Sequence, residues 1–126
     1  MEGKVLYPEL SFSIAGLSYR IFKELGYGLR EKYYQDAYAN SLEKSNIPFN
    51  RERHIIFKYD GAKIGSCFLD FVVKDVIVVE LKVRHHLGYA DIQQVMSYLK
   101  AGNFKLAIIL YFTKEGVKFR RVLNSK

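Results

Sequence analysis

The sequence predicts an α+β fold in which a central mixed, mainly antiparallel sheet is flanked by helices, in the order ααβββαββ. Before residue 45, apolar residues recur at spacings of three and four, which is the period of amphipathic helices. From residue 49 onward, short runs rich in Val, Ile and Phe alternate with turn residues, and one helical segment interrupts them. The length of 126 residues is that of one domain, so we expect 1–126 to form a single domain.

Two helices are expected at the start of the chain. Over 10–25, five apolar residues share one helix face: Leu10, Ile14, Leu17, Ile21 and Leu25. Gly26-Tyr27-Gly28 is expected to end this helix, because glycine is unfavourable inside helices. A second helix is expected over about 29–44, and Asn46 and Pro48 follow it as breakers.

The remaining elements are expected to build the sheet. Strands over 51–59 and 62–73 flank Asp60-Gly61, a dipeptide typical of tight hairpin turns. A third strand is expected over 76–83, and after a polar loop at 84–88 a helix over 89–102 with Gly102 at its C-cap. Strands over 106–112 and 117–123, joined by a turn at 114–116, are expected to complete the sheet.

Composition narrows the class of protein. An apolar fraction of 49% argues against disorder, and a formal charge of +7 favours a polyanionic partner such as nucleic acid. Cys67 is the only cysteine, which excludes an intramolecular disulfide and a Cys-rich zinc site. This use of cysteine favours a reducing compartment, so we expect a cytoplasmic protein. No segment approaches the roughly 18 apolar residues of a membrane span, so no membrane partner is expected.

Three charged residues interrupt two strands that are otherwise apolar: Asp70, Glu80 and Lys82. Because side chains alternate along a strand, Glu80 and Lys82 point to the same face. Asp70 joins them if the hairpin loop comprises 74–76, whereas a two-residue loop would place Asp70 opposite Val79. Two carboxylates on adjacent strands suit Mg²⁺, and a neighbouring lysine can stabilise charge on a phosphate. The structural alternative is a salt-bridge cluster on a solvent-facing side of the sheet.

These charged residues are part of a wider pattern. The spacing D-x9-E-x-K on a hairpin, preceded by a helical glutamate and followed by a helix, resembles the PD-(D/E)XK nuclease superfamily. Gly28-x-x-Glu31-x-x-Tyr34 is similar to the signature of the GxxExxY family, a small group within that superfamily. Gln94-Val95-Met96-Ser97-Tyr98 is similar to the Q-h-x-x-Y element of RecB-type nucleases. Leu69 replaces the proline of the superfamily's name.

The resemblance covers residues 10–123 and implies a restriction-endonuclease-like core. It also implies a nuclease that hydrolyses phosphodiester bonds of nucleic acid, with DNA as the expected polymer and Mg²⁺ or Mn²⁺ as cofactor. The implied metal ligands are Asp70, Glu80, Glu31 and the main-chain carbonyl of Leu81. The implied catalytic residues are Lys82, Glu80, Asp70, Glu31 and Gln94, and the implied substrate contacts are Tyr98, Tyr34 and Arg84.

Several of these residues have structural alternatives. A carboxylate such as Glu31 is favoured in the first turn of any helix by the helix dipole. Tyr34 and Tyr38 could be core aromatics whose hydroxyls find a partner, and for Tyr38 we favour that interpretation. The adjacent pair His85-His86 lacks further His or Cys residues nearby in the sequence, so we expect a loop beside an anionic groove and no zinc site.

Two other functions are compatible with the same sequence. One is a non-catalytic nucleic-acid-binding module, and the other is a protein-interaction module, acting as a homodimer or in a larger complex. The basic residues outside this hairpin could contact phosphates, both in a nuclease and in a non-catalytic nucleic-acid-binding module. Alternatively, they could be solvated strand edges. They are Arg51, Arg53, Lys58, Lys118, Arg120 and Arg121.

Overall fold

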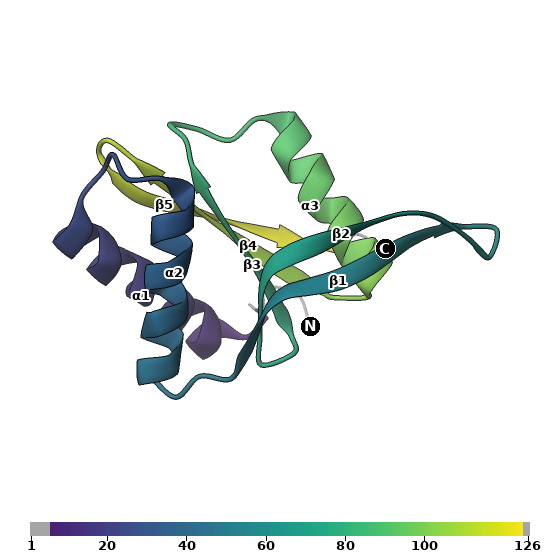
Figure 1. Ribbon diagram of the computed structural model, residues 1–126, viewed down its shortest axis with the longest axis horizontal. Helices are drawn as coiled ribbons and strands as arrows, with labels where there is room; N and C mark the ends of the chain where they lie inside the picture. Colours follow the sequence, from purple (N-terminus) through teal and green to yellow (C-terminus); the bar gives the residue numbers. More distant parts are fainter. Residues whose placement is uncertain (1–5, 125–126) are drawn as a thin grey trace.

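The computed structural model describes residues 6–124 and confirms the predicted order of elements (Figure 1). The first and last residues of the predicted domain 1–126 lie outside the described residues. The helices are α1 (Pro8–Leu25), α2 (Glu31–Lys44) and α3 (Tyr89–Gly102). The strands are β1 (Phe49–Tyr59), β2 (Ala62–Val73), β3 (Ile77–Val83), β4 (Leu106–Thr113) and β5 (Gly116–Leu123).

The five strands form one mixed sheet in the order β1-β2-β3-β4-β5. β3 and β4 are parallel, and every other neighbouring pair is antiparallel. Parallel neighbours require a crossover connection, and α3 provides it. Helices α1 and α2 cover one face of the sheet, and α3 covers the other (Figure 1). The α+β prediction with a central mixed sheet and flanking helices is therefore confirmed.

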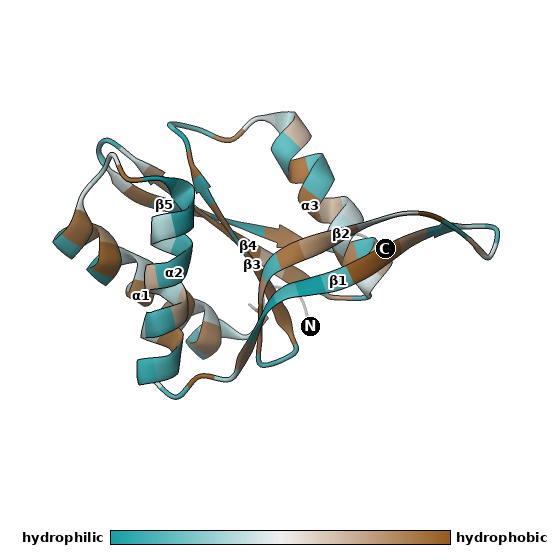
Figure 2. Cartoon of the chain, viewed as in Figure 1, coloured by the Kyte–Doolittle hydropathy of each residue, from teal (hydrophilic) through white to brown (hydrophobic). Residues whose placement is uncertain are grey.

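The core consists of two layers, one on each face of the sheet. In the first layer, Tyr38 of α2 packs with Val79 and Leu81 of β3, and in the second, Leu99 of α3 packs with Val78. β4 is fully buried on both faces over 106–110, as expected for a central strand with a parallel partner. Hydrophobic residues accordingly concentrate in the central strands and on the inner sides of the helices (Figure 2).

Three helix ends differ from the prediction. α1 begins two residues earlier than predicted, at Pro8. α2 begins two residues later, at Glu31, because Arg30 is the N-cap and its backbone is extended, with a ψ of 150°. α3 includes Gly102, and Asn103 takes the left-handed C-cap position with a φ of 61°. Gly102 has a packing role: a Cβ atom there would lie 2.7 Å from the ring of Phe104. Asparagine tolerates the left-handed conformation better than most residues, so it can replace glycine as a cap.

Among residues 6–124, no helix is long and apolar enough to cross a membrane.

Candidate active site

The site forms where β2 and β3 separate. Their ladder contains three pairs, from Val73 opposite Ile77 to Phe71 opposite Val79. The hairpin loop therefore comprises 74–76, the register that sets Asp70 across from Glu80. At this point, which we call the fork, side chains replace the ladder. The Asp70 N–H donates to Glu80 Oε2 at 3.0 Å, and the Leu81 N–H donates to Asp70 Oδ2 at 3.0 Å.

The fork results from a local break in the strand. Leu69 and Val72 both pack on the α3 side of the sheet, whereas Phe71, between them, packs on the α1 and α2 side. Strict alternation would place Leu69 and Phe71 on the same side. The break falls at Asp70, and Glu52, across from it on β1, has a φ of 55°. The β1–β2 hairpin therefore turns away from β3 here, which leaves the backbone of Asp70 free to meet Glu80.

The two carboxylates of the fork lie close together, and the pKa of each is raised; Glu80 is buried and Asp70 is half-buried. Glu80 is only 6% exposed. Burial, followed by repulsion from Asp70, raises the pKa of Glu80 to about 8, although the Asp70 N–H and the charge of Lys82 oppose this shift. Burial also raises the pKa of Asp70, against the hydrogen bond from Leu81 and the charge of Lys82. A proton or a cation between Asp70 and Glu80 is therefore favoured.

The donor set of the fork fits a divalent hard cation. Within residues 6–124, no group of three or more His, Cys, Asp and Glu side chains is arranged to hold a metal ion, so an all-protein cage is absent there. Asp70 and Glu80 supply two carboxylates. The N–H and C=O of one strand residue point to the same side, so the Leu81 carbonyl also faces the fork. Mg²⁺ usually takes one or two carboxylates and completes its shell with water and phosphate oxygens.

Lys82 lies on the same face of β3 as Glu80, as the alternation predicted. Its side chain is half-buried. The charge of Lys82 lowers the pKa of all three candidate acids, Glu31, Asp70 and Glu80. The ammonium is therefore electrostatically coupled to every carboxylate of the site.

Helix α2 brings Glu31 to the end of β3. Glu31 is the first residue of α2, and its carboxylate accepts a hydrogen bond from the backbone of Val83. Partial desolvation, followed by repulsion from Asp70, raises the pKa of Glu31, and Lys82 opposes this shift. Glu31 thus responds to the charge of Asp70 although its side chain is exposed to solvent.

Gln35 connects the acids and was not identified from the sequence. Its Nε2 donates to Glu31 Oε2 at 3.3 Å, and its side chain also forms a hydrogen bond with Asp70 that lowers the pKa of that acid. The spacing of four residues from Glu31 places both on one helix face, which was the available signal. Gln35 therefore orients an acid from the helix relative to an acid from the sheet.

Tyr34 has a structural role in the core, in place of the predicted contact with substrate. The ring is fully buried and stacks on Phe112 with centroids 4.3 Å apart. The hydroxyl donates to the Gly26 carbonyl at 2.5 Å and accepts from the Leu29 N–H at 3.3 Å. Because it closes the loop that leads into α2, Tyr34 fixes the position at which Glu31 begins the helix. Tyr38 is also a core residue, as favoured from the sequence, with its hydroxyl on the Ile14 carbonyl.

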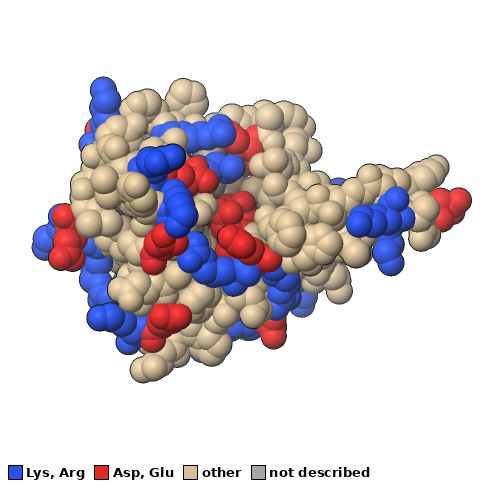
Figure 3. All heavy atoms as spheres, viewed as in Figure 1, with Lys and Arg blue, Asp and Glu red and all other residues tan. Residues whose placement is uncertain are grey.

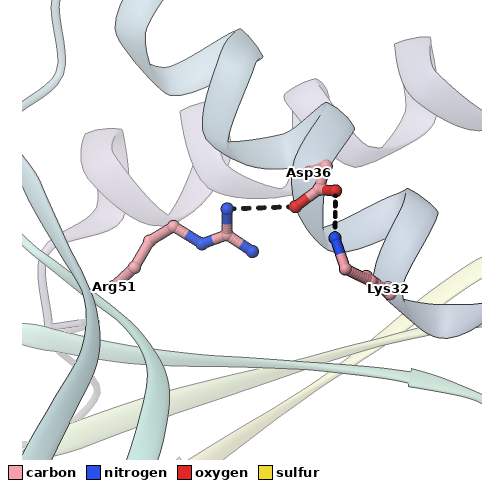
Figure 4. A network of polar contacts seen from close by, with 3 residues as sticks. All are labelled: Lys32, Asp36 and Arg51. Atoms are coloured by element: carbon pink, nitrogen blue, oxygen red, sulfur yellow. Dashed lines mark hydrogen bonds and ion pairs between the residues drawn. The ribbon is translucent and has the colours of Figure 1, made fainter.

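A basic cluster lies on the α2 side of the fork (Figure 4). Asp36 bridges Lys32, at 2.8 Å, and Arg51 of β1, at 3.1 Å. The Arg51 guanidinium lies over the ring of Phe71, and its charge lowers the pKa of Asp70. An open hollow of about 540 Å³ is lined by this cluster together with Gln35 and Glu52. Figure 3 shows basic and acidic side chains gathered at the centre of this view.

Helix α3 borders the fork on the opposite side. Burial and the charge of Glu80 raise the pKa of Tyr98 to about 12, so its hydroxyl lies within the field of the fork. Gln94 lies one helical turn earlier on the same side of α3 and is exposed. Arg84, after β3, binds Asp91 at 2.8 Å and lowers the pKa of Glu31. The structure thus groups the predicted residues around one fork, except for Tyr34, which is in the core, and Gln94, which is assigned to this side only by its helical spacing from Tyr98.

The sequence pattern of a known family spans nearly the whole chain. The profile of the PD-(D/E)XK nuclease superfamily matches residues 8–122. The chain belongs to the PD-(D/E)XK nuclease superfamily. The matched range includes the whole fork, with Asp70, Glu80 and Lys82.

Two solved structures share the PD-(D/E)XK fold of this chain. The first, SSO0001, has a TM-score of 0.61 and 18% identity, over 93% of this chain and 58% of that protein. The second is the alkaline exonuclease LHK-Exo from Laribacter hongkongensis, with a TM-score of 0.55 and 9% identity, over 97% of this chain and 72% of that protein. No curated protein matches the chain. At such identities these neighbours support the fold only, and this chain spans little more than half of SSO0001.

Proposed function

We propose that this protein is a divalent-metal-dependent nuclease that hydrolyses phosphodiester bonds of DNA. One observation carries the proposal: Asp70 and Glu80 face each other across the fork, with raised pKa values, beside Lys82. A buried carboxylate with a second carboxylate beside it is costly unless positive charge compensates the pair. The superfamily of the chain and its likeness to the alkaline exonuclease LHK-Exo support the same reaction class.

Asp70, Glu80 and the Leu81 carbonyl would hold Mg²⁺ or Mn²⁺. A bound ion would supply Lewis-acid chemistry and lower the pKa of water. Lys82 is placed to stabilise negative charge that develops on the phosphate, because its ammonium is already coupled to the acids of the site. Glu31, with its raised pKa, can accept a proton more readily than an ordinary glutamate.

The residues around the fork would bind and orient the nucleic acid. Arg51 and Arg84 offer cationic groups on two sides of the acids. Gln94 and Tyr98 line the α3 side and offer hydrogen-bond donors. The net charge of +7 would favour the approach of a polyanion despite the acids of the fork.

Within the superfamily, we assign the chain to the GxxExxY family. The φ of 115° at Gly28 and the hydrogen bonds of Tyr34 give that signature a physical reason, because together they present Glu31 to the end of β3. We further propose that 1–126 is a single domain that acts in the cytoplasm, as a homodimer or within a larger complex.

The test is cleavage of end-labelled single- and double-stranded DNA and RNA in Mg²⁺ or Mn²⁺. Glu80→Ala is compared with wild type and with Glu43→Ala, which removes an exposed carboxylate at the far end of α2. We expect DNA cleavage by wild type and Glu43→Ala, and none by Glu80→Ala. Equal cleavage by Glu80→Ala would refute the proposed site. Salt-sensitive binding without cleavage, unaffected by Asp70→Asn, would support the non-catalytic module instead.

A further inference from the structure

The β1–β2 hairpin projects beyond the sheet. β2 pairs with β3 only through 71–73, so the part of the hairpin beyond the fork has no neighbouring strand (Figure 1). We call residues 54–68 the arm. One side of the arm packs on α3 through Ile55 and Phe57. The other side, and the tip, face solvent.

The exposed side of the arm carries large apolar residues. Phe68 is 63% exposed, Ile64 68% and Tyr59 74%. Phe68 also packs against the imidazole of His54, with ring centroids 4.8 Å apart. Figure 2 shows this hydrophobic stretch on the projecting hairpin, beyond the hydrophilic start of β1. A two-stranded ribbon gains little stability alone in water, so a long arm with an exposed apolar side indicates a binding surface.

The charge of the arm indicates what it binds. Lys58 and Lys63 lie directly opposite each other on the two strands. Like charges in this position destabilise a hairpin, and an anionic partner would remove that cost. Asp60, in the turn, is the single acidic residue of the arm. Figure 3 shows basic side chains along the projecting hairpin and acidic atoms at its tip.

A hollow beside the arm is also positively charged. It has a volume of about 570 Å³ and lies between β1 and the last turn of α3. Two of its lining residues are lysines, and none is acidic. The lining residues are His54, Ile55, Ile56, Lys58, Lys100 and Ala101.

We propose that the arm binds the backbone of the nucleic acid on one side of the cleavage site. This inference rests on the proposed nuclease function. A second copy of the chain is a poorer partner, because a two-fold contact centred on this lysine pair would bring Lys58 and Lys63 against the same lysines. Lys63 precedes Asp70 by seven residues, which is about 23 Å of strand. At 3.4 Å per step, the arm would reach about seven base pairs from the fork.

The test measures binding to fluorescein-labelled DNA in EDTA at 50–200 mM NaCl. The probes are duplexes of 24 and 8 base pairs and a 24-nucleotide single strand. The arm variant is Lys58→Gln/Lys63→Gln. The matched control, Lys44→Gln/Lys114→Gln, removes the same charge from exposed positions at the end of α2 and in the turn between β4 and β5.

We expect the arm variant to bind the 24-base-pair duplex about tenfold more weakly or worse at 50 mM salt, and the slope of log K against log salt to become shallower by about 1.8. On the single strand the slope should change by about 1.4. Wild type should prefer the longer duplex, and the arm variant should lose that preference. The control should keep the wild-type salt slopes and the preference for the longer duplex.

Three outcomes would overturn the inference. If the salt slopes of the arm variant and the control are equal on the 24-base-pair duplex and on the 24-nucleotide single strand, the arm does not contact the nucleic-acid backbone. A change in oligomeric state confined to the arm variant, measured by sedimentation, would assign the arm to a second copy. If wild type binds and cuts no nucleic acid, the proposed function fails together with the inference, whereas cleavage by wild type with unchanged arm-variant binding refutes the inference alone.

Discussion

Replacing Glu80 with Gln removes a buried titratable carboxyl group from the fork while preserving the shape of the side chain. The Gln carbonyl can still accept the Asp70 N–H, and its amide can donate to the Asp70 carboxylate. In wild type, an acid with a raised pKa binds its proton more tightly in the folded state than in the unfolded chain. The free energy of unfolding of wild type therefore falls as pH rises from 4.5 to about 8. In Glu80→Gln, where the side chain does not titrate, this decrease is absent.

The size of the effect follows from the shift. A pKa that moves from 4.5 to about 8 corresponds to an upper limit of about 5 kcal/mol at pH 9, and to about 3 kcal/mol at pH 7. In EDTA we therefore expect Glu80→Gln to be more stable than wild type at pH 7 and 9, and nearly equal at pH 4.5. Ten millimolar Mg²⁺ with a Kd of about 1 mM would stabilise wild type by about 1.4 kcal/mol, but not the variant.

Urea denaturation in EDTA at three pH values measures the first effect, and thermal denaturation with and without Mg²⁺ measures the second. Glu43→Gln is the control, because it neutralises an exposed carboxylate and should show neither effect. The reasoning is refuted if Glu80→Gln is no more stable than wild type at pH 9, or if Mg²⁺ stabilises both proteins equally.

Three further predictions concern neighbouring residues. Lys82→Ala should reduce single-turnover cleavage by at least about 100-fold while the fold is retained by circular dichroism; unchanged cleavage would remove Lys82 from catalysis. Gln35→Ala should move the acid limb of the pH–rate profile to higher pH, because the lost hydrogen bond held the pKa of Asp70 down; an unmoved limb would assign Gln35 a packing role alone. Tyr34→Phe should lower the free energy of unfolding by about 1–3 kcal/mol in urea, because the Leu29 N–H loses its partner; weaker DNA binding at unchanged stability would instead restore its predicted substrate contact.

The sequence predicted the fork better than it predicted the surroundings of the fork. Side-chain alternation placed Glu80 and Lys82 on one face, and the three-residue loop aligned Asp70 with Glu80. These are local constraints that any strand obeys. The β2–β3 ladder ends at Phe71, next to a positive φ at Glu52 in a different strand, so the pattern of β2 alone could not reveal it.

The roles of Gln35 and Tyr34 depended on tertiary structure. Gln35 meets Asp70 only because α2 crosses the sheet at that place, and its position after Glu31 indicated a shared helix face but no partner. Tyr34 is part of the same signature as Glu31, yet its ring points into the core, where it stacks on Phe112. Periodicity over so short a stretch did not distinguish a core tyrosine from one that faces the site.

The projection of the arm was not predictable either. Alternating residues in β1 and β2 indicated a hairpin, but they could not show that β3 leaves β2 at Phe71. Exposed apolar residues such as Ile64 and Phe68 are indistinguishable in sequence from core residues of an ordinary sheet.

The central claim is that Asp70 and Glu80 form one metal-dependent site for phosphodiester hydrolysis. The most direct measurement is the single-turnover rate of DNA cleavage as a function of Mg²⁺ concentration, for wild type, Asp70→Asn and Glu80→Gln. We predict a saturable Mg²⁺ dependence in wild type, no cleavage in EDTA, and loss of cleavage in both variants at every concentration. Cleavage that persists in EDTA, or that survives in either variant at the wild-type rate, would contradict the claim.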